Sequence, residues 1–170
     1  MSCQREKRLK KRPTNEAPVA GVRPLEARVV VQQCSRAKVK TRDGVDGAEP
    51  QYAEIGEGLV VFVCFFDGAT EDTAHRIANA VMNTQFFHGC LSRSRRPTSV
   101  LELPGGVLLL PLQSQVSGQA RRGSQLFSSL ASHCREMLSK SRATGGAVEQ
   151  GVYGQRQQVK IEPMSHVLEF

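Results

Sequence analysis

Short runs of β-branched and apolar residues, separated by polar turn residues, follow one another along the first part of the chain. Residues 28–34 read as a first strand, and residues 37–41 alternate between apolar and polar side chains as a second. The pairs Asp43-Gly44 and Asp46-Gly47 supply turn chemistry before a third strand at residues 52–55. This region therefore predicts β structure.

The most apolar run of the chain, Leu59–Phe66, spans eight residues and is followed by Asp67-Gly68. Because the run has no polar side to turn toward solvent, it predicts a strand that is buried on both faces. It is far shorter than the roughly 20 apolar residues that cross a bilayer. We therefore expect a central strand and no transmembrane segment.

Two segments repeat apolar residues with helical spacing. The first begins at Thr70 with acids in its first turn, and apolar residues recur at i, i+3, i+4, i+7 and i+8 from Ala74 to Met82. The second covers about Ser124–Ser139 and carries apolar residues on one face. Two amphipathic helices that pack on the sheet are expected.

The remaining apolar runs predict further strands. Val100–Leu103 and Val107–Leu110 flank Pro104-Gly105-Gly106, which is typical of a hairpin. Three more strands are predicted near the end of the chain, at Ala147–Val152, Gln157–Ile161 and His166–Phe170. About eight strands and two helices indicate a mixed α/β fold.

The positive charge is concentrated at the N-terminus. Residues 1–13 hold six Lys and Arg against one acid, so they contribute +5 of the net +7 and leave +2 for the rest. Residues 13–26 contain three prolines and a glycine and read as an irregular leader. We expect a basic, disordered arm at residues 1–26 and a single domain at residues 27–170. The alternative, more specific hypothesis is that the arm attracts RNA.

The composition agrees with one folded domain. Of the 170 residues, 39% are apolar, 23% are charged and 5% are aromatic, which excludes wholesale disorder and the collagen and coiled-coil classes. The N-terminus has neither the apolar stretch nor the cleavage site of a secretory signal. A cytoplasmic location is therefore expected.

The cysteines and histidines show no spacing typical of a metal site. The five cysteines are odd in number and widely separated, so we interpret them as reduced, and the four histidines stand singly. His133 and Cys134 are adjacent, but neighbours on a helix point about 100° apart and cannot act as base and nucleophile together. We expect no metal and no cofactor. Motifs of serine hydrolases, phosphate-binding loops and zinc proteases are missing from the sequence as well.

Read in order, the segments resemble the D-aminoacyl-tRNA deacylase family over almost all of residues 27–170. The segments that carry this resemblance are Ala27–Ala37, Leu59–Phe66, Leu103-Pro104-Gly105, Gly151-Val152-Tyr153-Gly154 and Leu168-Glu169-Phe170. The resemblance implies a three-layer β/β/α domain that forms a homodimer. It also implies a proofreading hydrolase that cleaves the ester of mischarged aminoacyl-tRNA.

Gln33 indicates the branch of the family. The D-specific branch generally has arginine at this position, whereas the second, animal-type branch has glutamine, as this chain does. The animal-type branch is known for removing L-alanine that is wrongly attached to threonine tRNA, and activity toward D-aminoacyl-tRNA is also described. Both substrates therefore stay open.

The resemblance also implies site residues, although both pocket motifs depart from the family pattern. The strand-end motif corresponds to residues 111–115, where Leu112 occupies the usual glutamine position, and the Gly-Pro motif has Glu162 before Pro163. The implied catalytic residues are Pro111, Gln113, Ser114, Pro163 and Ser165. The implied substrate pocket consists of Gln33, Leu112, Met164, Tyr153 and Gly154.

Basic residues of the domain are candidates for contacts with the tRNA backbone. They are Arg28, Arg36, Lys38, Arg93, Arg95, Arg96, Arg121 and Arg122. The imperfect pocket motifs support a second hypothesis, in which the chain is a non-catalytic RNA-binding module with the same fold. Both hypotheses involve RNA as a partner, but only the first includes hydrolysis.

Overall fold

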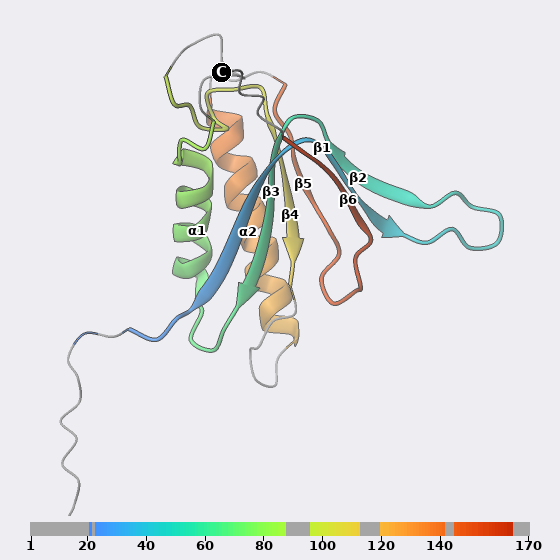
Figure 1. The fold of residues 1–170 in the computed structure, drawn as a ribbon. Helices are drawn as coiled ribbons and strands as arrows, with labels where there is room; N and C mark the ends of the chain where they lie inside the picture. Colours follow the sequence, from blue (N-terminus) through green and yellow to red (C-terminus); the bar gives the residue numbers. More distant parts are fainter. Residues whose placement is uncertain (1–20, 22, 88–95, 113–119, 142–144, 165–170) are drawn as a thin grey trace, which may run out of the picture.

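The computed structural model describes residues 21, 23–87, 96–112, 120–141 and 145–164, which form a curled sheet packed on two helices (Figure 1). This mixed α/β fold confirms the expected class. In chain order, the elements are β1 (Ala27–Arg42), β2 (Gln51–Ile55), β3 (Gly58–Phe65), α1 (Glu71–Asn83), β4 (Gly106–Pro111), α2 (Ala120–Lys140), β5 (Val148–Gln150) and β6 (Val159–Pro163).

The sheet combines antiparallel and parallel pairs. Its six described strands follow the order β2-β1-β3-β4-β5, and β6 pairs with β1. β1 is antiparallel to β2, β3 and β6, whereas β3 is parallel to β4 and β4 is parallel to β5. Parallel neighbours need a crossover connection, and α1 and α2 lie in the two connections concerned.

The predicted hairpin at residues 100–110 is wrong. Residues 107–110 lie in β4, but the partner of β4 is β3, with Leu59 opposite Val107 and Phe62 opposite Leu110. Val100–Leu103 instead forms turns, in which the amides of Glu102 and Leu103 donate to the Ser99 carbonyl. The physical reason is burial, because residues 107–110 are apolar on both faces and suit a covered parallel pair better than a hairpin.

The first two predicted strands are in fact one strand, β1. The register with β6 shifts between Cys34 and Arg36, and the Ser35 hydroxyl donates to the Glu162 carbonyl oxygen at 3.2 Å. A β-bulge of this kind bends a strand without ending it. The first half of β1 can therefore pair with β3 while the second half pairs with β2 and β6.

Most of the other predicted strands and helices are present in the structure. The strand at 52–55, the buried strand at 59–66 and the helix that begins after Thr70 are confirmed by β2, β3 and α1. The second helix begins at Ala120, four residues before its expected start, and the strands expected at 147–152 and 157–161 are β5 and β6 with shifted ends. The strand expected at His166–Phe170 lies outside the described residues.

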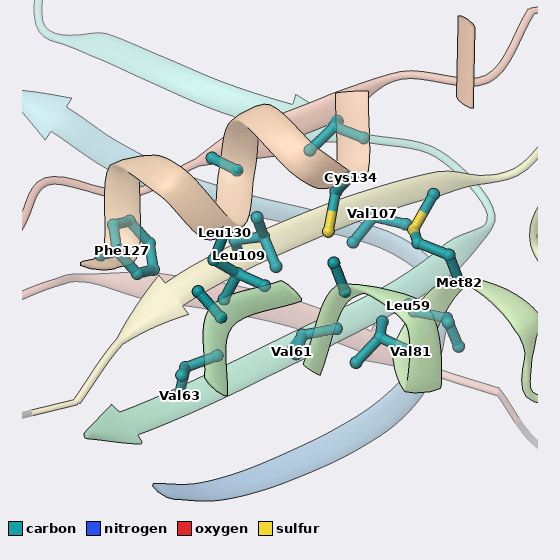
Figure 2. Close-up of a cluster of buried hydrophobic side chains, with 14 of the residues drawn as sticks. Leu59, Val61, Val63, Val81, Met82, Val107, Leu109, Phe127, Leu130 and Cys134 are labelled. Carbon is teal, nitrogen blue, oxygen red and sulfur yellow. The ribbon is translucent and has the colours of Figure 1, made fainter. Parts of the chain in front are cut away.

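The side chains of β3 and β4 alternate between two hydrophobic clusters on the two faces of the sheet. Figure 2 shows the cluster on the helix side, where Leu59 and Leu109 meet Met82 from α1 and Leu130 from α2. On the other face, Val60 and the even-numbered leucines of β4 pack against buried residues of β1 and β2, namely Cys34, Ala37, Val39, Ala53 and Ile55. The sheet is thus covered by helices on one face and by its own curled half on the other.

Glu26 fixes the chain to α1 just before the first strand. Its carboxylate accepts hydrogen bonds from the Thr73 hydroxyl at 2.6 Å and from the Arg76 guanidinium. The Thr73 hydrogen bond, with help from Arg76, lowers the pKa of Glu26 below its usual value of 4.5. The proposed arm lies almost entirely outside the described residues, so the boundary at residue 26 stays a prediction.

In the part of the chain that the structure describes, neither helix is long and apolar enough to cross a membrane.

Gly58→Ala is expected to destabilise the domain. A Cβ at Gly58 would overlap the backbone of Gly106 on the neighbouring strand, and neither strand can move without breaking the ladder. Overpacking of this kind lowers the free energy of unfolding by about 1–3 kcal/mol or more. Urea denaturation measures the loss. Gly56→Ala is the control, because its Cβ would meet no atom within 4 Å. Equal midpoints for the two variants would contradict the prediction.

Glu26→Gln is expected to lower the melting temperature at neutral pH and to have little effect in acid. A carboxyl whose pKa is lowered by folding stabilises the protein above its unfolded pKa, here 4.5, and this stabilisation is lost as the pH falls through the folded pKa. Melting curves of wild type and variant should therefore converge below pH 4.5. Glu49→Gln, an exposed position in the loop before β2, provides the control. A gap that persists unchanged in acid would refute the role of the Glu26 charge.

Candidate functional site

The carboxyl ends of β3, β4 and β5 meet at one edge of the sheet because these strands are parallel. β3 is followed in the chain by α1 and β4 by α2, and the N-termini of both helices lie toward this carboxyl edge (Figure 1). Pro111 ends β4 here, and Leu112 remains anchored because its amide donates to the Val63 carbonyl at 2.8 Å. Open α/β sheets bind ligands at this kind of edge.

Tyr153 and Gly154 follow β5 toward the same edge. The Gly151 amide donates to the Leu109 carbonyl at 2.9 Å, which extends the pairing beyond β5. The half-buried Tyr153 ring lies 6.2 Å from the ring of Phe127 on α2. Gly154 has a φ of +80°, a conformation that favours glycine and turns the chain back. The structure therefore brings four predicted site residues to the carboxyl edge: Pro111, Leu112, Tyr153 and Gly154.

The second predicted motif lies at the opposite end of the sheet. Pro163 pairs with Cys34, which is opposite Gly58 at the start of β3, whereas Pro111 is opposite Val63. Val63 lies five positions after Gly58 in β3, which corresponds to about 17 Å at roughly 3.3 Å per residue. Met164 follows Pro163 at this far end. In one chain, the two motifs therefore lie at opposite ends of the sheet.

Gln33 also lies at this far end, and its side chain has a structural partner. The Gln33 amide nitrogen donates to the carbonyl oxygen of Phe86, in the segment that leaves α1. The strand register places Gln33 opposite Leu59. Gln33 therefore connects β1 to the end of α1, a role that its family position did not indicate. The remaining implied residues, Gln113, Ser114 and Ser165, lie outside the described residues.

The candidate tRNA-binding arginines divide between the two edges. Arg28 lies at the carboxyl edge, where its guanidinium carbon is 6.0 Å from the centroid of the Phe66 ring. At the start of α2, Arg121 is exposed, whereas Arg122 donates to the Ala69 carbonyl at 2.7 Å and connects the helix to the β3–α1 loop. The other candidates are Arg36, which forms an ion pair with Glu54, Arg96 beyond the far end of α1, and Arg93 and Arg95, which lie outside the described residues.

Two of the described cysteines, Cys34 and Cys134, are poor nucleophiles. Burial raises the pKa of the Cys34 thiol and raises that of Cys134 to about 12, so almost no reactive thiolate forms at neutral pH. The sequence missed one proximity, because His133 packs edge-on against His75 of α1 at 4.9 Å between ring centroids. Nevertheless, no group of three or more His, Cys, Asp or Glu among the described residues is arranged to hold a metal ion.

Comparison with known proteins identifies relatives of this fold and sequence. The model of the family described as D-Tyr-tRNA(Tyr) deacylase matches residues 30–168. D-aminoacyl-tRNA deacylase 2 from Gallus gallus is 33% identical over 89% of this chain and 100% of the relative. The proteins of the same name from Danio rerio and Homo sapiens are 32% and 29% identical, over 86% and 88% of this chain and 100% and 98% of the relatives.

Solved structures show the same fold at low sequence identity. A structure described as a probable eukaryotic D-amino acid tRNA deacylase superposes with a TM-score of 0.62 and 19% identity, covering 82% of this chain and 95% of the other. A c-Myc DNA unwinding element binding protein gives a TM-score of 0.56 and 20% identity, covering 81% of this chain and 91% of the other. The similarity confirms the arrangement of the curled sheet and two helices.

Substitution of two adjacent arginines should separate structural from binding roles. Arg122→Gln removes the hydrogen bond to the Ala69 carbonyl and is expected to lower the free energy of unfolding by about 1 kcal/mol. Arg121→Gln removes the same charge from an exposed side chain and should leave stability unchanged while weakening tRNA binding. Chemical denaturation and filter binding measure the two effects. Equal stability losses in both variants would contradict the structural role of Arg122.

Proposed function

This chain belongs to the D-Tyr-tRNA(Tyr) deacylase family, and on that premise we propose that it hydrolyses the ester between a wrong amino acid and the terminal adenosine of tRNA. The observation that carries this proposal is the family match over residues 30–168, together with relatives named D-aminoacyl-tRNA deacylase 2. The chain is thus an aminoacyl-tRNA hydrolase, and the cytosol, where translation consumes aminoacyl-tRNA, is its proposed place of action.

The chemistry requires positioning more than a strong nucleophile. Water adds to the ester carbonyl, the carbon–oxygen bond to the ribose breaks, and the ribose oxygen takes the proton, releasing the free amino acid and tRNA. Backbone N–H groups that stabilise the oxyanion and hold the water in line can supply many kcal/mol of rate enhancement. In this proposal, the tRNA's own 2′-hydroxyl assists the proton transfer.

The carboxyl edge is the proposed site of this reaction. Pro111 ends β4 at this edge. Residues 111–114 would shape the adenosine and carbonyl side in this proposal, with Tyr153 and Gly154 beside them. Arg28 and Arg121 lie at the same edge and could bind phosphates of the acceptor end. Arg93, Arg95 and Arg96 are proposed as further tRNA contacts.

A homodimer completes the pocket in this proposal. Pro163, Met164 and Ser165 would recognise the α-centre of the amino acid, but in one chain Pro163 lies at the other end of β3 from Pro111. A pocket that uses both motifs therefore needs Pro163 from a second copy. The three-layer β/β/α arrangement of each subunit would present that motif to its partner. A monomeric mass by light scattering would remove this part of the proposal.

The substrate is proposed to be L-alanyl-tRNA or D-aminoacyl-tRNA. Gln33 and the relatives named deacylase 2 support the animal-type branch, from which both possibilities derive. The second candidate function is a non-catalytic RNA-binding module. Glu162 favours it, because this residue occupies the glycine position of the Gly-Pro motif.

Deacylation assays should show that the protein releases L-alanine or D-amino acids from mischarged tRNA and spares correctly charged tRNA. If backbone groups and the 2′-hydroxyl carry the chemistry, Ser114→Ala and Ser165→Ala should retain turnover within about tenfold, whereas loss of a serine nucleophile would cost orders of magnitude. Release of labelled amino acid over time gives the rates.

Two outcomes would contradict this assignment. Failure to hydrolyse any mischarged tRNA, with RNA binding intact, would favour the non-catalytic module. Loss of all turnover in one serine variant that remains folded would replace the backbone mechanism with a nucleophilic serine.

A further inference from the structure

The curled half of the sheet carries a basic groove on the side away from the helices. The groove has a volume of about 690 Å³ and is lined by Lys38 of β1, Tyr52 of β2 and residues 156–160 of the loop and strand at β6. Figure 1 shows β2, β6 and the second half of β1 beside one another. We call this surface the outer groove. Its volume lies within the range of about 300–1,000 Å³ that is typical of ligand sites.

The outer groove holds positive charges that the described protein does not neutralise. Lys38 lies directly opposite Lys160 in the β1–β6 ladder, and Arg156 adds a third cation. Like charges opposite one another destabilise a sheet. An arrangement of this kind is stabilised when an anion binds between the cations.

Two neighbouring cations on β1 form ion pairs with acidic residues of the protein. Arg36 forms an ion pair with Glu54, and Lys40 lies 3.3 Å from the Asp43 carboxylate. Among the described residues, Lys38, Arg156 and Lys160 form no ion pair. Glu54 is opposite Lys38 in the ladder, yet its carboxylate bonds to Arg36 instead. Lys38 therefore stays available for an external anion.

An exposed aromatic ring lies within this charged surface. Tyr52 is 49% exposed, and the Lys38 ammonium is 5.2 Å from the centroid of its ring. Exposed aromatic rings in basic grooves are the features that bind single-stranded nucleic acid, because the bases stack on the ring while cations bind the phosphates. A second copy of this chain is a poorer occupant, since its own groove would bring further cations against these.

We propose that the outer groove binds a strand of RNA, with phosphates at Lys38, Lys160 and Arg156 and an unpaired base stacked on Tyr52. That this RNA is the tRNA substrate rests on the proposed function. The groove then acts as a second binding surface, distinct from the carboxyl edge where hydrolysis is proposed.

One short segment connects the two surfaces. Tyr153 is at the carboxyl edge and Arg156 is in the groove, three residues later, which is at most about 11 Å of extended chain. The Gln157 side chain donates to the Val152 carbonyl at 2.5 Å and fixes the turn between them. An RNA strand in the groove can therefore continue to the reacting end.

Fluorescence anisotropy with labelled uncharged tRNA, measured over a range of salt concentrations, tests the binding. Tyr52→Leu should weaken binding roughly tenfold through lost stacking, and Tyr52→Phe should stay within about twofold because it keeps the ring. In the double variant Lys38→Gln and Lys160→Gln, the slope of log K for binding against log salt concentration should become less steep by about 1.4. This corresponds to about 0.7 for each lost phosphate contact. Lys140→Gln, which removes one charge from an exposed lysine on α2, is the control for non-specific charge attraction.

A kinetic readout links the groove to the substrate. Groove variants should raise KM for full-length mischarged tRNA and leave hydrolysis of a minimal aminoacyl-adenosine ester unchanged. If the wild type hydrolyses neither substrate, the proposed function fails, while the anisotropy measurement still decides whether the groove binds RNA.

Three results would overturn the inference. The first is unchanged tRNA affinity in the folded Tyr52→Leu and double lysine variants, with folding checked by circular dichroism. The second is an equal loss of affinity in Lys140→Gln, which would indicate non-specific charge attraction. The third is a groove variant that changes the molecular mass of the protein in light scattering but leaves its RNA affinity unchanged. That result would assign the groove to contact between two copies of the chain.

Discussion

The parallel pairing of β3 with β4 is the constraint on which the rest of the structure depends. The two strands start at Gly58 and Gly106, where the backbones approach so closely that a side chain on either residue would collide with its neighbours. Both strands are then buried on their two faces by apolar side chains. Parallel strands need long connections, so this pair and the parallel β4–β5 pair each require a crossover. α1 lies in the first crossover and α2 in the second, and both helices cover one face of the sheet.

The location of the proposed chemistry follows from the same pairing. Parallel strands end at one edge, so Pro111 and the segment after β5 meet there with the starts of both helices. The bulge at Ser35 determines the other face, because it bends β1 and turns its second half toward β2 and β6. As a result, Pro163 lies far from Pro111 in one chain, and the outer groove forms on the bent half.

The sequence predicted those elements whose signal is local. The apolar run at 59–66 predicts burial on both faces, and it forms β3. The apolar spacing after Thr70 predicts burial on one face, and that segment forms α1. The family resemblance also came from sequence, because ordered segments at fixed spacing survive changes in most side chains. Four residues that the resemblance implied for the site, Pro111, Leu112, Tyr153 and Gly154, lie at one edge of the sheet. The resemblance did not reveal that Pro163 lies at the other end.

The spacing of apolar residues indicates which side chains are buried, but it does not indicate which strand lies beside which. The pairing of the strands is seen only in the tertiary structure. The local spacing at 107–110 predicted a hairpin, but the run is buried on both faces and pairs with β3 in parallel. Contacts between distant residues, such as Gln33 with Phe86, His75 with His133 and Lys38 with Lys160, have no local signal. The sequence by itself thus determined the family and the elements with a clear local pattern. The tertiary structure decided which strands pair and which side chains come into contact, because both depend on strand register and helix packing.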